Sequence, residues 1–194
     1  FNGCTNLDVL ATDVPDLTAV TSLLGMFANC PALVGNASFD SWDTSSITRM
    51  DRLFFNATTF NQGIGSWNTG SVVIFSEMFS GATSFNQDIG NWNTSSAERM
   101  FGMFNSARAF DQNIGSWNVG LVSNMNFMFF RARSFNQDIG AWNVGSVTVM
   151  DGMFREALAF NQDIGGWDVS RVRDMSNLFA QATAFNQDIS GWDV

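Results

Sequence analysis

The segment Phe85-Asn-Gln-Asp-Ile-Gly-Asn-Trp-Asn93 and the segment Met100-Phe-Gly-Met-Phe-Asn-Ser-Ala107 that follows it occur in related versions along most of the chain. Tryptophan marks the period, because all 7 Trp residues fall at a constant step of 25 residues: Trp42, Trp67, Trp92, Trp117, Trp142, Trp167 and Trp192. A fixed period of this length indicates a repeat protein whose units stack into a solenoid.

The repeat extends over most of the chain and predicts one domain, residues 1–194. Residues 25–194 are tandem 25-residue repeats, of which the last is incomplete. Residues 1–24 keep the apolar positions but lose Trp and the other signature residues, and they are either a degenerate repeat or an N-terminal cap. Terminal repeats are often atypical because they cover the end of the core.

Two spacings of apolar residues alternate within a unit. From Ile114, the residues Trp117, Val119 and Val122 follow the frame of a leucine-rich repeat, and Trp-x-Val predicts a short strand with both side chains inward. From Val122 to Phe135 the apolar residues recur every three or four positions, which favours a short helix. The predicted fold class is therefore α/β: a right-handed β/α solenoid of leucine-rich-repeat type, with a parallel sheet on one face and short helices on the other.

The composition argues against several functional classes. The formal net charge is -9, which disfavours a nucleic-acid partner, since phosphates favour basic surfaces. All basic residues are Arg; the chain lacks Lys, His and Tyr, and with them many of the usual general acids, bases and metal ligands. No apolar run approaches the length of a membrane span, so we expect no direct membrane insertion. We expect a protein that is not an enzyme and uses no cofactor.

The two cysteines occupy matching places in a shared Phe-x-x-Cys-x-x-Leu frame, one repeat apart. Neighbouring coils would place Cys4 and Cys30 within the Cα separation that a disulfide accepts. A Cys4–Cys30 disulfide would indicate an oxidising compartment and an exported protein. Two small buried thiols are the alternative.

The residues that flank each Trp are small and polar, and if Trp points inward they point outward. This predicts a shallow hydrogen-bonding strand face, on which the tentative ligand-binding residues are Asn68, Asn91, Asn93, Ser116, Asn118, Asn143 and Asp168. Such a face suits a glycan or an extended protein surface. The alternative is that these side chains satisfy neighbouring backbone groups and hold the coils in register.

Two further columns precede the Trp. For the Asn-Gln pairs, such as Asn86-Gln87, we expect a structural role, because stacked amides can satisfy the free backbone groups of turns. Stacked carboxylates repel one another unless a cation such as calcium lies between them. The weak calcium candidates are Asp88, Asp138, Asp163 and Asp188. Because Gly63 and Asn113 interrupt this column, local turn hydrogen bonds are the stronger interpretation.

The block from Met153 to Ser170, repeated from Leu178 to Val194, resembles the repeat of the BspA-like leucine-rich-repeat surface proteins, including the related mycoplasma lipoprotein repeats. The resemblance covers residues 25–194. It implies a surface-exposed or secreted protein with a role in adhesion or ligand binding, and it transfers no catalytic residue.

These observations predict a non-enzymatic extracellular or cell-surface binding or adhesion module. It would recognise a glycan or protein on a cell surface or matrix through its strand face. The alternative function is that of a purely structural spacer repeat in a larger surface protein.

Overall fold

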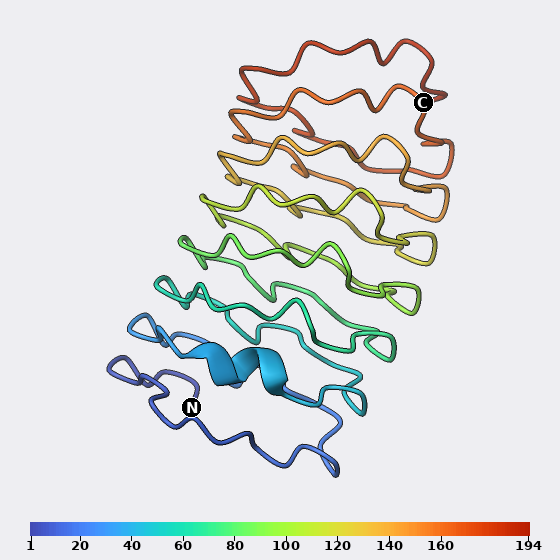
Figure 1. The fold of residues 1–194 in the computed structure, drawn as a ribbon. Helices are drawn as coiled ribbons and strands as arrows, with labels where there is room; N and C mark the ends of the chain where they lie inside the picture. Colours follow the sequence, from blue (N-terminus) through green and yellow to red (C-terminus); the bar gives the residue numbers. More distant parts are fainter.

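The computed structural model describes residues 1–194 as a stack of flat coils that follow one another in sequence order (Figure 1). The single helix is the 3₁₀-helix η1, Ala37–Ser41, which lies near the N-terminal end of the stack. Apart from it, the coils consist of turns and irregular backbone joined by isolated β-bridges. The repeat period predicted from the Trp spacing is therefore present as a repeating coil, while the regular secondary structure is absent.

A single parallel bridge per coil connects each coil to the next. The segment Met100–Ala107 and its counterparts in the other coils are called the Met-Phe segments. The bridged residues each come immediately before one of them: Ser22, Arg49, Ile74, Arg99, Asn124, Val149 and Asp174. No bridge extends into a strand. The predicted parallel sheet is therefore wrong, because the backbone departs from the extended conformation directly after each bridge.

The Met-Phe segments form neither helix nor strand, since alternate residues bond in different directions. Within one segment, the amides of Met50 and Phe54 donate to carbonyls of the next coil, those of Ile74 and Met78, at 3.0 and 2.9 Å. The intervening amide of Leu53 donates to the Met50 carbonyl of its own coil, at 3.1 Å. A helix would direct every amide along its own axis, so the predicted short helices are wrong.

Two residues in each of these segments have left-handed φ angles. They are four positions apart in every coil, as in Arg52 and Asn56, with φ of 56° and 55°. A residue with a left-handed φ angle interrupts a right-handed helix, and it also interrupts the extended backbone of a strand. A succession of short turns puts an apolar residue inward every three or four positions, which explains why the apolar spacing resembles that of a helix.

The predicted Trp-x-Val strand is also wrong, although both side chains do point inward. Trp117 and Val119 are buried, yet the Trp117 amide closes a turn onto Ile114 O at 3.1 Å and the Val122 amide closes another onto Val119 O at 2.9 Å. The right-handed β/α solenoid of leucine-rich-repeat type is thus replaced by a coil built from consecutive turns.

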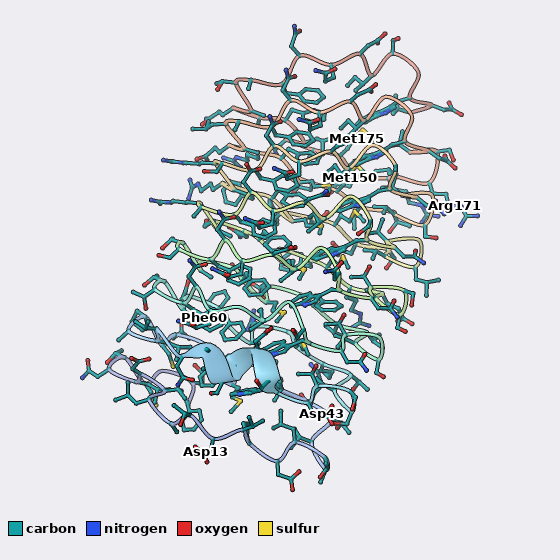
Figure 2. All side chains as sticks on the ribbon, viewed as in Figure 1. Asp13, Asp43, Phe60, Met150, Arg171 and Met175 are labelled. Carbon is teal, nitrogen blue, oxygen red and sulfur yellow. The ribbon has the colours of Figure 1, made fainter.

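Aromatic side chains fill the interior and stack from coil to coil. Phe79 packs on Phe85 of its own coil with ring centroids 4.0 Å apart and on Phe104 of the next coil at 5.6 Å. Trp92 stacks on Trp117 at 6.2 Å with an interplanar angle of 4°. Figure 2 shows Phe60 inside one side of the stack and Met150 and Met175 inside successive coils. This core of 51 residues runs without interruption from Leu17 to Leu178.

The predicted disulfide is wrong, because both cysteines are free. Cys4 is exposed and Cys30 is fully buried, where its thiol lies 3.1 Å from the carbonyl oxygen of Phe1. The matching sequence frames align the two residues along the chain, but their side chains face different surroundings. The two free cysteines therefore do not indicate an oxidising compartment or an exported protein.

Candidate functional site

The residues that follow each Trp form an exposed column on the outside of the stack, which we call the Asx column: Asp43, Asn68, Asn93, Asn118, Asn143, Asp168 and Asp193. In the first six of them, the side-chain Oδ1 accepts the amide of the residue two positions later, at 3.0 to 3.2 Å. This is an Asx turn, which Asn and Asp favour because their short side chains reach their own backbone. Figure 2 places Asp43 at the outer rim of the coils.

The Asx turns determine which polar atoms of the column face solvent. Oδ1 is occupied by the turn, whereas the Nδ2 groups of Asn68, Asn93, Asn118 and Asn143 donate no hydrogen bond within the protein. Four exposed amide donors therefore lie in a row, one in each successive coil. The turn holds each donor in place, so a bound acceptor would order little additional chain.

The two predicted residues that lie before Trp differ from each other. Ser116 is exposed, but its hydroxyl donates to the carbonyl of Gly90 in the preceding coil at 2.9 Å. Asn91 is exposed and its side chain makes no hydrogen bond. Asn91 thus adds a second free amide beside Asn93, while Ser116 links two coils.

Asp43 and Asp168, which lie on either side of the four asparagines of the Asx column, are stabilised in their charged form. The hydroxyl and amide of Ser170 both bond to Asp168, at 2.6 and 3.1 Å, and lower the pKa of Asp168, with a smaller contribution from Arg171. The same bonds from Ser45 lower the pKa of Asp43. A carboxylate that accepts hydrogen bonds retains its charge to lower pH. The row of neutral donors is therefore flanked by two anionic residues.

The Asn-Gln pairs have the structural role predicted for them. The Oδ1 of Asn86 accepts both the backbone amide of Asp111 in the next coil at 2.9 Å and the Nε2 of Gln112 at 2.9 Å. Asp111, the one variant in this column, accepts the amide of Asn136 and the Nε2 of Gln137 in the same way. The prediction that stacked amides satisfy backbone groups is confirmed.

The Asp column consists of separate local turns. The Oδ1 atoms of Asp88, Asp138, Asp163 and Asp188 each accept the amide two residues later, at 2.9 to 3.0 Å, and Asn113 does the same in its coil. No group of three potential metal ligands forms anywhere in the protein. These contacts support the turn interpretation of the column, with one carboxylate oxygen of each residue already bonded.

Comparison with known proteins identifies a family from the repeat. Residues 21–133 and 109–194 match the family described as "Mycoplasma protein of unknown function, DUF285". The chain belongs to the DUF285 family. No curated protein and no solved structure matches it. The match agrees with the mycoplasma part of the resemblance and does not extend to the BspA-like leucine-rich repeats.

The bridge position of the DUF285 repeat varies from coil to coil. The bridge position is occupied by Arg49, Ile74, Arg99, Asn124, Val149 and Asp174 in successive coils, whereas the Trp position never changes. Three of them, Arg49, Ile74 and Arg99, line part of a hollow of about 260 Å³. Sequence reasoning missed this hollow. The sequence feature that could have indicated it is one repeat position that is charged in some coils and apolar in others. Residues that all repeats share do not include this position.

No helix in this DUF285 chain is long and apolar enough to cross a membrane.

Proposed function

We propose that this DUF285 chain is a non-enzymatic binding module at the cell surface or outside the cell. It recognises a glycan or protein on a cell surface or matrix through its Asx column. The observation that carries this proposal is the row of exposed Nδ2 donors at Asn68, Asn93, Asn118 and Asn143, held by Asx turns and unused within the protein. A repeating ligand with hydrogen-bond acceptors at regular intervals complements such a row.

Two further features support a binding role over catalysis. The polar groups of the column repeat from coil to coil instead of converging at one place, whereas an active site brings different groups together. The aspartates of the Asp column each accept a hydrogen bond within their own turn, so one oxygen of every carboxylate in the column is already occupied.

The surface location is proposed from the repeat itself. The repeated block resembles that of BspA-like surface proteins and mycoplasma lipoprotein repeats, and the DUF285 match includes the mycoplasma name. An antibody against this chain should label intact cells of the source organism, and protease added to those cells should remove the signal. Labelling only after permeabilisation would contradict a surface location.

The binding test uses a substitution that keeps the turns. Replacing Asn93, Asn118 and Asn143 together by Asp preserves Oδ1, as Asp43 and Asp168 demonstrate. It replaces each Nδ2 donor by a carboxylate oxygen and so adds three negative charges to the column. Wild type and variant would be applied to a glycan array, to immobilised matrix proteins and to cells. We expect the variant to fold and to lose at least about tenfold in affinity, as two or three lost hydrogen bonds imply.

Replacing Arg171 by Gln is a control for a change of charge beside the column, since Arg171 contributes to the lowered pKa of Asp168. Arg171 is exposed in a later coil and lies at the outer rim (Figure 2). A ligand that binds wild type, the triple Asp variant and R171Q equally would contradict the Asx column as the binding site.

The second candidate function is a structural spacer within a larger surface protein. It is favoured by the bonds within the chain that occupy Oδ1 in six of the seven column residues and the hydroxyl of Ser116. A spacer would bind nothing in the three assays above, and the triple Asp substitution would leave the function of the larger protein unchanged.

A further inference from the structure

A hollow of about 260 Å³ lies on the bridged face of the stack, apart from the Asx column. Four successive coils contribute to it: Leu24 from the first, three residues from the second, three from the third and Arg99 from the fourth. The lining is Leu24, Arg49, Asp51, Arg52, Ile74, Ser76, Glu77 and Arg99. We propose that this hollow binds a single carboxylate group carried on a short aliphatic stem, such as a glutamate side chain of a partner protein.

The backbone bridges determine how the arginines are arranged. Arg49 pairs with Ile74, and Ile74 pairs with Arg99, in consecutive parallel bridges. Two rungs of such a ladder are separated by roughly 10 Å. The long arginine side chains can therefore approach an anion from both sides, above Ile74.

The charges in the hollow leave a cation facing solvent. Arg49 binds Asp51 through two contacts of 3.2 and 3.0 Å, and Arg52 binds Glu77 at 2.7 Å. The acidic side chains are only 14% and 18% exposed, compared with 45% and 57% for their arginine partners. Arg99 is exposed and forms no ion pair, even with its exposed neighbour Glu98. The hollow thus contains three guanidinium groups and two largely buried carboxylates.

The lining also indicates which anion fits. A guanidinium group matches the planar carboxylate with two parallel hydrogen bonds. Leu24, which is 50% exposed, and Ile74 offer apolar surface to an aliphatic stem. The protein as a whole carries a charge of -9, so a densely acidic partner would be repelled. A single carboxylate with an apolar stem satisfies both conditions, and this proposal does not depend on a ligand at the Asx column.

The probe is N-acetyl-glutamate amide, which carries one carboxylate, compared with the neutral N-acetyl-glutamine amide. Each would be titrated into ¹⁵N-labelled protein at low salt and followed by NMR. We expect saturable shifts of the Ile74, Ser76 and Arg99 amides with the glutamate probe only, with a Kd on the order of millimolar. Equal shifts with the glutamine probe, or none with glutamate, would overturn the proposal, as would saturation by inorganic phosphate alone.

Substitutions inside and outside the hollow distinguish specific binding of the probe from a general effect of surface charge on its affinity. Arg99→Gln should weaken binding of the glutamate probe about tenfold or more, because a charge-assisted hydrogen bond is lost. Arg171→Gln should leave the affinity unchanged. Glu77→Gln should strengthen binding, since it releases Arg52 from its ion pair. Weaker binding by Glu77→Gln, or equal losses in the R99Q and R171Q variants, would contradict the proposal, and circular dichroism confirms that each variant is folded.

Discussion

Each tryptophan in the stack combines a buried ring with one bond to the preceding coil. The indole Nε1 of Trp92 donates to the carbonyl of Ile64 at 3.0 Å, and Trp67, Trp117, Trp142, Trp167 and Trp192 make the equivalent bond. Trp42 is the exception, because its buried Nε1 has no acceptor. The constant spacing of Trp therefore reflects a repeated hydrogen bond as well as repeated apolar burial.

This difference gives a matched pair of substitutions. Trp92→Phe removes ring volume and leaves the Ile64 carbonyl with the Trp67 amide as its one remaining donor. We therefore expect a loss of about 2–4 kcal/mol in the free energy of unfolding. Trp42→Phe removes a similar volume but no hydrogen bond, and should cost less. Urea unfolding measures both, and equal losses would show that the indole bond contributes nothing.

A second pair of substitutions, at Asn86, tests how much the Asn-Gln pairs contribute to stability. Asn86→Ala leaves the Asp111 amide without its acceptor and leaves the Gln112 side chain with the backbone carbonyl of residue 86 alone. It should destabilise the protein by about 1–3 kcal/mol. Asn86→Asp keeps the acceptor, as Asp111 does one coil later, and should be nearly neutral at pH 7. Thermal unfolding distinguishes the two, and an Asp variant as unstable as the Ala variant would contradict the role of Oδ1.

At the scale of the element, the glycine of the five Ile-Gly-x-Trp motifs allows the coils to approach closely. A Cβ atom at Gly140 would lie 2.5 Å from the carbonyl oxygen of Asp163 in the next coil, and one at Gly90 would lie 2.6 Å from that of Asn113. These neighbours are backbone atoms, which cannot rotate away. The Ile-Gly-x-Trp motif is thus a turn whose glycine is required by the adjacent coil.

Gly140→Ala should therefore destabilise the protein by about 1–3 kcal/mol, since it forces two coils apart. The matched control is Gly166→Ala, because a Cβ there meets no atom within 4 Å and Ala141 occupies the same place one coil earlier. We expect the control to unfold at the same urea concentration as wild type. A neutral Gly140→Ala would mean that the coils separate easily.

Apolar spacing could not reveal the backbone conformation of the elements. The positions Met125, Met128 and Phe129 point inward in the structure as they would in a helix, and their burial was predictable. The choice between a helix and consecutive turns depends on acceptors in another coil, such as Val149 O for the Met125 amide. Local patterns contain no information about such distant acceptors.

At the scale of the whole molecule, the acidic surface should make stability depend on pH. Hydrogen bonds from the following serine lower the pKa of Asp43, Asp168, Asp174 and Asp188 below the ordinary value of 3.8. Since the folded pKa is lower than the unfolded one, these groups stabilise the fold above about pH 4. That stability is lost as the pH falls through the folded pKa values.

Urea unfolding between pH 2 and 7 should therefore show a decline that begins near pH 4. Replacing the four aspartates by Asn keeps the Asx turns and removes the titration, so the decline should become shallower. An unchanged pH profile in the Asn variant would show that these turns do not contribute to acid sensitivity.

The sequence by itself determined the repeat, the inward residues and the role of the Asn-Gln column, because these depend on residue type and spacing within one unit. The outward position of Asn93 and its neighbours also followed from Trp pointing inward. Only the tertiary structure decided that the coils are made of turns, that Cys4 and Cys30 remain apart, and that Arg49 and Arg99 flank a hollow. The physical reason is that these features depend on contacts between coils, where each backbone amide and charge finds its partner about one repeat away.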